Sequence, residues 1–203
     1  CGKDFPVSLR FSVISKTKDF QSGAMPGEKY HEVGRDLSEA KKAAKLFEES
    51  GYDMLNCDNG TYDAWYWAHP GPYMPHNCNL EDVKEIKKIV NIPIVCAGKM
   101  TPIVAANAIK NNEIDAMGVA RQFLVDKEWV TKLINDKIDE IYKEYGCQVI
   151  VNGIFDSLKY YLRLLTNSDE FLTCYTKNLQ ANEELDYEHK ISWNRIVENR
   201  KDD

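Results

Sequence analysis

The sequence predicts an α/β fold built on a parallel sheet, and two observations lead to this prediction. Over residues 5–142, four short apolar segments alternate with segments in which apolar residues recur at helical spacing. One short segment, residues 92–97, is a nearly unbroken apolar run, which is typical of a strand buried on both faces. Strands that alternate with amphipathic helices favour parallel pairing through right-handed crossovers.

The first strand and helix are indicated by alternation and by capping residues. Residues 5–13 read F-P-V-S-L-R-F-S-V, where apolar and polar side chains alternate as in a strand. The stretch 16–35 is rich in Gly, Lys and Asp and is predicted to be a long loop. Residues 36–39 read D-L-S-E, a capping-box pattern that opens a helix, and Gly51 is its natural end.

A second short strand over residues 53–57 leads into a long loop, residues 58–78. An aromatic cluster at residues 62–73 allows three interpretations: packing of the loop itself, a wall for a substrate, or a surface for a partner. His69 and His76 lie in this loop, where a lone histidine usually has no catalytic role.

The next two strands and helices follow from similar signals. Asn79 is expected to cap a helix, and Thr101 followed by Pro102 marks the start of another. The strand over residues 92–97 lies between these helices, and residues 114–118 are predicted to form the fourth strand. The chain up to residue 142 therefore consists of four consecutive βα units.

Composition excludes several classes of protein. The 203 residues are 43% hydrophobic and 29% charged, which excludes a wholly disordered or collagen-like chain. No apolar run approaches the roughly 18 residues that span a bilayer. A net charge of −6 argues against a nucleic-acid or anionic-membrane partner. The six cysteines form no C-x-x-C pair and no signal peptide is visible, so we expect a cytoplasmic protein; without an initiator Met, we expect a piece of a longer chain.

Small residues and cations occur together at the carboxyl ends of the last two strands. Gly98 with Lys99, and Ala120 with Arg121, predict a cradle for a phosphate monoester, since barrels bind phosphate there. A glycine turn with two solvated cations is the alternative. Arg10 lies in the first strand between apolar neighbours. A buried arginine needs an anionic or strongly polar partner, and a structural ion pair within the protein would supply one.

Four stretches carry a family resemblance over about residues 2–142. They read G-K-D-F-P-V-S-L-R at 2–10, G-Y-D-M-L-N-C-D-N-G-T-Y-D-A-W-Y-W-A-H-P at 51–70, I-P-I-V-C-A-G-K-M at 92–100 and I-D-A-M-G-V-A-R-Q-F-L-V-D-K-E-W at 114–129. The chain thereby resembles the old yellow enzyme family, in its branch of 2,4-dienoyl-CoA reductases, 2-enoate reductases and bile-acid-inducible oxidoreductases. The resemblance implies that residues 1–142 are the C-terminal half, strands five to eight, of a TIM (β/α)8 barrel. Residues 143–203 would form a mostly helical tail of unknown role.

The resemblance also implies a cofactor, FMN, and residues that bind it. Arg10 would contact the N1/O2 edge of the isoalloxazine and stabilise negative charge on the reduced flavin. Gly98 and Lys99 would hold the phosphate after the seventh strand, and Ala120 and Arg121 after the eighth. The residues expected to line the substrate pocket are Gly60, Thr61, Tyr62 and Asp63.

The chain departs from the family pattern in two places. The family's early strands, including the tyrosine proton donor of this branch, would precede Cys1, so we expect no catalytic residue within this chain. The iron–sulfur motif of the reductase branch is matched only by Cys147, because Glu144 and Val151 occupy the other two positions. About four thiolates are needed, so neither an iron–sulfur cluster nor another metal is expected.

Three functions follow from these observations. The first is part of an FMN-dependent ene-reductase that reduces activated C=C bonds of an enoate or enoyl-CoA-like substrate with NAD(P)H as electron donor. The second is a catalytically inactive half barrel that associates with other chains, including copies of itself, because a half barrel exposes two sheet edges. The third is a non-redox barrel enzyme that binds a phosphorylated substrate.

Overall fold

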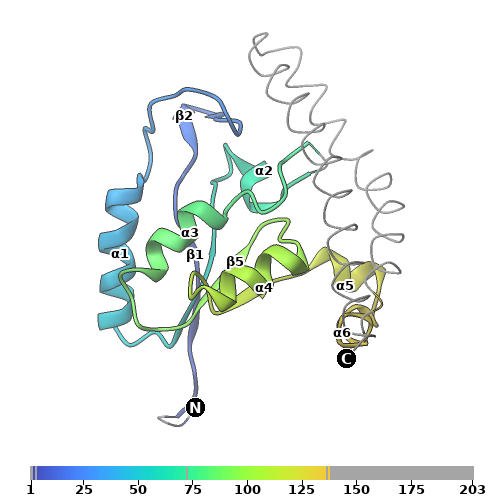
Figure 1. Cartoon of the computed structure of the whole chain (residues 1–203). Helices are drawn as coiled ribbons and strands as arrows, with labels where there is room; N and C mark the ends of the chain where they lie inside the picture. Colours follow the sequence, from blue (N-terminus) through green and yellow to red (C-terminus); the bar gives the residue numbers. More distant parts are fainter. Residues whose placement is uncertain (1, 3, 72, 136, 138–203) are drawn as a thin grey trace. The chain divides into compact units, whose positions relative to one another are not determined.

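The computed structural model describes residues 2, 4–71, 73–135 and 137 (Figure 1). The chain divides into two compact units, which we describe separately: the first is Cys1–Pro70 with His76–Gly118, and the second is Gly71–Pro75 with the chain from Val119 onward. The predicted helical tail, residues 143–203, and the boundary expected at residue 142 lie outside the described residues.

A four-stranded parallel sheet organises the first unit, as the sequence predicts. Its strands are β1 (Ser8–Ser12), β4 (Met54–Asp58), β5 (Ile94–Ala97) and β6 (Ala116–Gly118), in the order β1-β4-β5-β6. Consecutive strands along the chain are thus neighbours in the sheet, each returning through a helical crossover. The register places Arg10 opposite Asn56, which lies opposite Val95.

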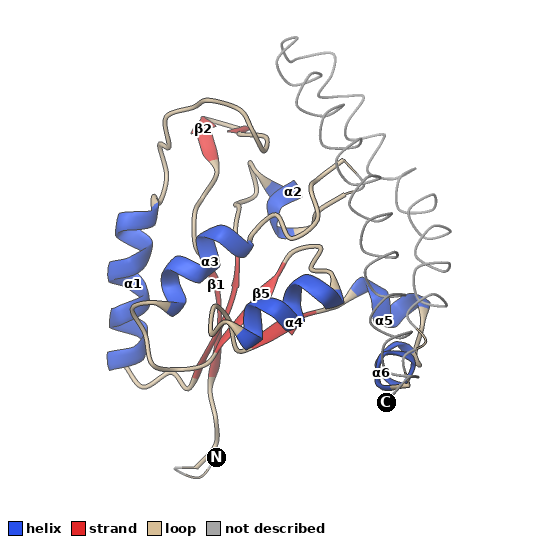
Figure 2. Cartoon of the chain, viewed as in Figure 1, coloured by secondary structure: helices blue, strands red, loops and turns tan. Residues whose placement is uncertain are grey.

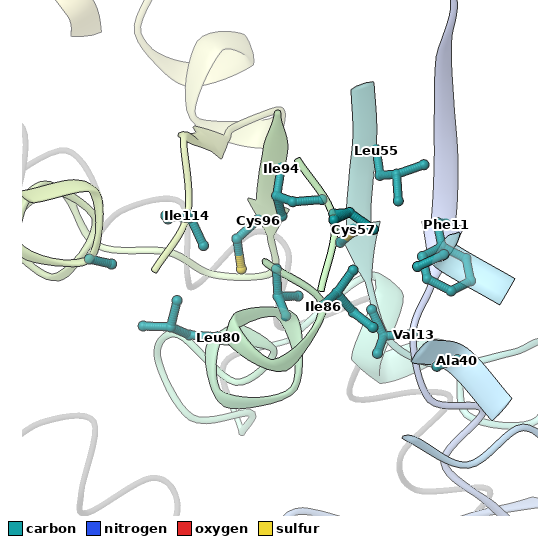
Figure 3. Packing of buried hydrophobic residues seen from close by; sticks show 14 of the residues in the cluster. Phe11, Val13, Ala40, Leu55, Cys57, Leu80, Ile86, Ile94, Cys96 and Ile114 are labelled. Atoms are coloured by element: carbon teal, nitrogen blue, oxygen red, sulfur yellow. The ribbon is translucent and has the colours of Figure 1, made fainter. Parts of the chain in front are cut away.

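Three helices cover one face of this sheet (Figure 2). They are α1 (Leu37–Glu49), α3 (Leu80–Lys87) and α4 (Pro102–Lys110). Phe11, Cys57 and Ile94 point from the strands toward Ala40 and Ile86 of the helices, and all five are buried (Figure 3). Because side chains alternate along a strand, the intervening residues point to the opposite face, which lacks a helical cover among the described residues of this unit.

The ends of α1 confirm the expected capping residues. The side chain of Asp36 accepts a hydrogen bond from the backbone N–H of Glu39, at 2.8 Å. Beyond the helix, Gly51 adopts a φ of +90°, the left-handed conformation that ends many helices. Pro102 occupies the first turn of α4, again as predicted.

Asn79 stands at the N-cap position of α3, but the expectation that its side chain caps the helix is wrong. The backbone at Asn79 is already helical, with φ −100° and ψ −10°, rather than extended as in a typical N-cap. Its amide bonds to other loops instead, as described below. The side chain of Thr101 likewise makes no capping bond to α4.

Both segments predicted as long loops contain short regular elements. The first holds a hairpin of β2 (Thr17–Asp19) and β3 (Ser22–Gly23), and the second holds α2 (Trp65–Ala68). Elements of two to four residues are too short to show a hydrophobic period, which explains why the pattern did not reveal them.

The second unit contains α5 (Arg121–Val125) and α6 (Trp129–Ile134). Asp126 joins them, since its carboxylate accepts from the backbone N–H of Glu128 at 2.9 Å and pairs with Lys132 at 2.8 Å. No helix within the described residues of either unit is long and apolar enough to cross a membrane.

Candidate functional site

Arg10 lies on the sheet face opposite the helices. Its neighbour Phe11 points into the core, so the alternation along β1 sends the arginine the other way, and 60% of its side chain is exposed. The Nε atom donates to Oδ2 of Asp58 at 3.1 Å, and an Nη nitrogen bonds to the same oxygen. The ion pair that the sequence left open as an alternative therefore exists, and it leaves the outer side of the guanidinium accessible.

Asp58 is the buried partner of this pair. It is the last residue of β4, lies in register opposite Ser12, and only 5% of its side chain is exposed. Burial raises the pKa of Asp58, while the hydrogen bond and charge of Arg10 act in the opposite direction. Sequence reasoning overlooked this residue, although an acidic side chain at the carboxyl end of a buried strand was a usable signal.

Gly98 and Lys99 form a left-handed turn directly after β5, with φ values of +122° and +53°. A Cβ atom at Gly98 would lie 2.1 Å from Nδ2 of Asn79. The structure therefore supplies a reason for glycine here, because the space beside the backbone holds the Asn79 amide. Lys99, half-buried, remains at the carboxyl end of β5, where the phosphate cradle was predicted.

Two buried asparagines connect the strand ends. Nδ2 of Asn79 donates to the carbonyl oxygens of Ala97, at 2.8 Å, and of Trp67, at 3.2 Å. Asn59 donates from Nδ2 to Oδ1 of Asn79 at 3.1 Å, and its own Oδ1 accepts from the backbone N–H of Ile14 at 3.0 Å. The loops after β1, β4 and β5 are thus held by side-chain amides, a role that the sequence did not reveal.

Lys16 adds a charged contact to this network. Its Nζ pairs with Oδ2 of Asp82 at 2.7 Å and lies 4.5 Å from the ring centroid of Trp67. The indole N–H of Trp67 donates to the carbonyl of Ala24 at 2.7 Å. Trp67 therefore anchors the loop after β4 to the loop that carries β2 and β3.

The four residues predicted to line a substrate pocket, Gly60, Thr61, Tyr62 and Asp63, differ in their surroundings. Gly60 is buried with φ +97°, and a Cβ there would lie 2.5 Å from the carbonyl oxygen of Ala64, so it shapes a tight turn. Thr61 is exposed and its hydroxyl lies 3.2 Å from that of Thr17, while Asp63 is half-buried. Tyr62 is 88% exposed. Thr61 and Tyr62 are thus accessible to a ligand, whereas Gly60 acts through the backbone.

The aromatic cluster separates into a buried part and an exposed stack. Tyr66 and Trp67 are buried, as expected for packing of the loop itself. Tyr62, Trp65 and His69 stack in sequence, with ring centroids 5.5 Å and 4.4 Å apart and interplanar angles of 9° and 14°. Planar rings stacked on the surface suit contact with another flat, apolar group.

Ala120 and Arg121 belong to the second unit. Ala120 is exposed and precedes α5, and Arg121 is the half-buried first residue of that helix. Their expected cooperation with Gly98 and Lys99 stays a prediction. Cys147, Glu144 and Val151 lie outside the described residues, within which no group of three potential metal ligands occurs.

Comparisons with known proteins agree on one family. The family model described as NADH:flavin oxidoreductase / NADH oxidase matches residues 1–140. A cinnamate reductase of Clostridium sporogenes is 42% identical over 149 residues, which are 73% of this chain and 22% of that protein. An NADH oxidase of Thermoanaerobacter brockii is 29% identical over 161 residues, 78% of this chain and 23% of that protein. A bilirubin reductase of Mediterraneibacter gnavus is 28% identical over 163 residues, 78% of this chain and 23% of that protein, so the chain spans less than a quarter of these relatives.

Proposed function

This chain belongs to the NADH:flavin oxidoreductase / NADH oxidase family, and we propose that it forms part of an FMN-dependent ene-reductase that uses NAD(P)H. The observation that carries the proposal is the exposed guanidinium of Arg10, presented on the sheet face that no helix of its unit covers within the described residues. A fixed positive charge on an accessible face suits an electron-rich group that gains negative charge.

The residue types on this face of the first unit and at the end of β5 suit FMN. Arg10 offers N–H donors to the N1/O2 edge of the isoalloxazine, because its bonds to Asp58 occupy only one side of the guanidinium. Gly98 and Lys99 offer a left-handed turn and a cation for the phosphate, and Ala120 with Arg121 would complete that site. When bound, FMN would supply hydride transfer between the nicotinamide and the substrate.

The chain's own contribution is to bind and to orient. Arg10 would stabilise negative charge at a defined position, and Lys99 would neutralise a phosphate. Tyr62 and Thr61 would line the substrate pocket from the loop after β4. We assign no proton donor among the residues of this chain.

For the substrate, we propose an enoate that carries an aromatic ring. One relative is a cinnamate reductase, and cinnamate is a flat arylacrylate. The exposed stack of Tyr62, Trp65 and His69 supports this class, because stacked rings bind a further ring through offset or edge contacts worth about 0.5–1.5 kcal/mol.

We also propose that the four strands are the C-terminal half of a TIM (β/α)8 barrel. The parallel order β1-β4-β5-β6 with helices on one face supports this architecture. The free thiols of Cys57, Cys78 and Cys96 support a reducing compartment, so we place the protein in the cytoplasm.

The proposal is tested on the full-length protein that carries these residues. We expect FMN to copurify with it and to support reduction of cinnamate by NADH or NADPH. The reaction is measured as the loss of nicotinamide absorbance. Substituting Lys99→Gln should weaken FMN binding about tenfold, because one charge-assisted phosphate contact is lost. Lys88→Gln is the matched control, since Lys88 is an exposed lysine paired with Glu85 at the end of α3. A colourless protein that takes up no added FMN would refute the proposed function.

A further inference from the structure

The pair formed by Arg10 and Asp58 joins an exposed cation to a buried carboxylate. The exposed fractions of the two side chains are 60% and 5%. Both bonds of the guanidinium go to one oxygen, Oδ2 of Asp58, and its remaining N–H groups donate to no other group within the described part of the chain. The arginine is thus held from one side and open on the other.

The carboxylate itself is held in place by the sheet. Asp58 is the last residue of β4, and its carbonyl oxygen accepts a hydrogen bond from the backbone N–H of Val13 at 2.7 Å. A buried carboxylate is costly unless it is paired, so the protein retains this charge only because Arg10 lies beside it. An anchor that serves only to orient an exposed arginine does not have to be charged, since a neutral carbonyl oxygen also accepts from Nε.

We propose that Asp58 is a positioning residue for Arg10 that also cancels part of its positive charge, and thereby lowers the preference of the site for reduced over oxidised FMN. This inference rests on the proposed function. The Coulomb interaction at a partly exposed site falls only slowly with distance, so a carboxylate in contact with the guanidinium opposes its effect on any nearby anion.

The substitution Asp58→Asn removes the negative charge of residue 58 and keeps an oxygen that can hold Arg10 in position. Asparagine has nearly the same shape and keeps a carbonyl oxygen that can accept from Arg10, but it carries no negative charge. We therefore expect the ratio of the dissociation constants of oxidised and reduced FMN to rise about tenfold. Asp58→Ser, which removes the same charge with a smaller side chain, is measured alongside in case the asparagine variant does not fold.

The experiment uses the full-length protein and measures this ratio by binding titration of oxidised FMN and by the midpoint potential of the bound cofactor. Glu85→Gln is the matched control, because it also removes one carboxylate from an ion pair, but on the helical side of the sheet. We expect it to leave the ratio within twofold. Arg10→Gln should lower the ratio, since the cation itself is lost.

A double variant tests whether Asp58 acts through Arg10. Without the guanidinium, burial favours the protonated carboxyl of Asp58, so Asp58→Asn should change the ratio by less than threefold in the Arg10→Gln background. An equal change in both backgrounds, or a ratio in Asp58→Asn no higher than in Glu85→Gln, would overturn the inference while leaving the proposed function intact. A wild-type protein that binds no FMN would overturn both.

Discussion

At the scale of single residues, glycine is required at two positions of positive φ for different physical reasons. Gly51 and Gly98 have φ values of +90° and +122°, but only Gly98 has a neighbour in the place of a Cβ atom. Gly51→Ala should therefore cost about 1 kcal/mol of unfolding free energy from backbone strain alone. Gly98→Ala should cost at least about 2 kcal/mol more, because the Asn79 amide must move. Urea unfolding of the two variants measures the difference, and equal losses would contradict this explanation of Gly98.

The cysteine thiols give a prediction that depends on pH. Burial raises the pKa of Cys57 to about 12, and likewise that of Cys78 to about 12. A thiol whose folded pKa lies above its unfolded value near 8.5 stabilises the folded state fully below that value and progressively less as the pH rises further. We expect the unfolding free energy to fall between pH 9 and pH 11, and less so in Cys57→Ala. Iodoacetamide should label Cys57 at pH 8 only after denaturation. Rapid labelling of this cysteine in the native protein, located by peptide mass spectrometry, would refute the assignment.

At the scale of elements, Asn79 connects the start of α3 to the segment after β4 and to the end of β5. Asn79→Ala would remove the hydrogen bonds that the carbonyls of Ala97 and Trp67 accept from Asn79. It would also remove one of the two bonds that Nδ2 of Asn59 donates, leaving its bond to Asp82. We expect a loss of about 2–4 kcal/mol of unfolding free energy, since unsatisfied buried groups cost about 1–3 kcal/mol each and relaxation recovers part of it. Asn107→Ala, at an exposed position of α4, serves as the control and should change stability by less than about 0.5 kcal/mol.

The elements and the site residues differ in how well the sequence predicts them. The strands, α1 and α4 were predictable because their apolar periods and the caps at Asp36 and Pro102 are local signals. The role of Asn79 was not, because an asparagine before a helix is usually a cap and its actual partners lie 12 and 18 positions away in the chain. Asp58 was missed for a similar reason: its partner, Arg10, is 48 positions away.

At the scale of the whole molecule, helices cover one face of the sheet, and the other face has no helical cover within the described residues of its unit. Phe11 and Ile94 lie under helices. On the alternate side, Arg10 is exposed and Asn56 and Val95 are only partly buried. A (β/α)8 barrel buries the inward side chains of its strands in layers, so an open inner face is what half of such a barrel would present. Exposed strand edges beside such a face favour association.

This architecture leads to a prediction for residues 1–142 expressed alone. If the four strands are half of a barrel, these residues would keep the proposed phosphate contacts of Gly98 and Lys99 but would lack the groups that the other strands contribute. We therefore expect their FMN affinity to be at least a hundredfold below that of the full-length protein. Quenching of FMN fluorescence measures this difference. Light scattering during gel filtration should show dimers or larger assemblies, because the edge strands β1 and β6 and the open face of the sheet gain partners by pairing. A stable monomer that binds FMN as tightly as the full-length protein would show instead that the four strands complete a site of their own.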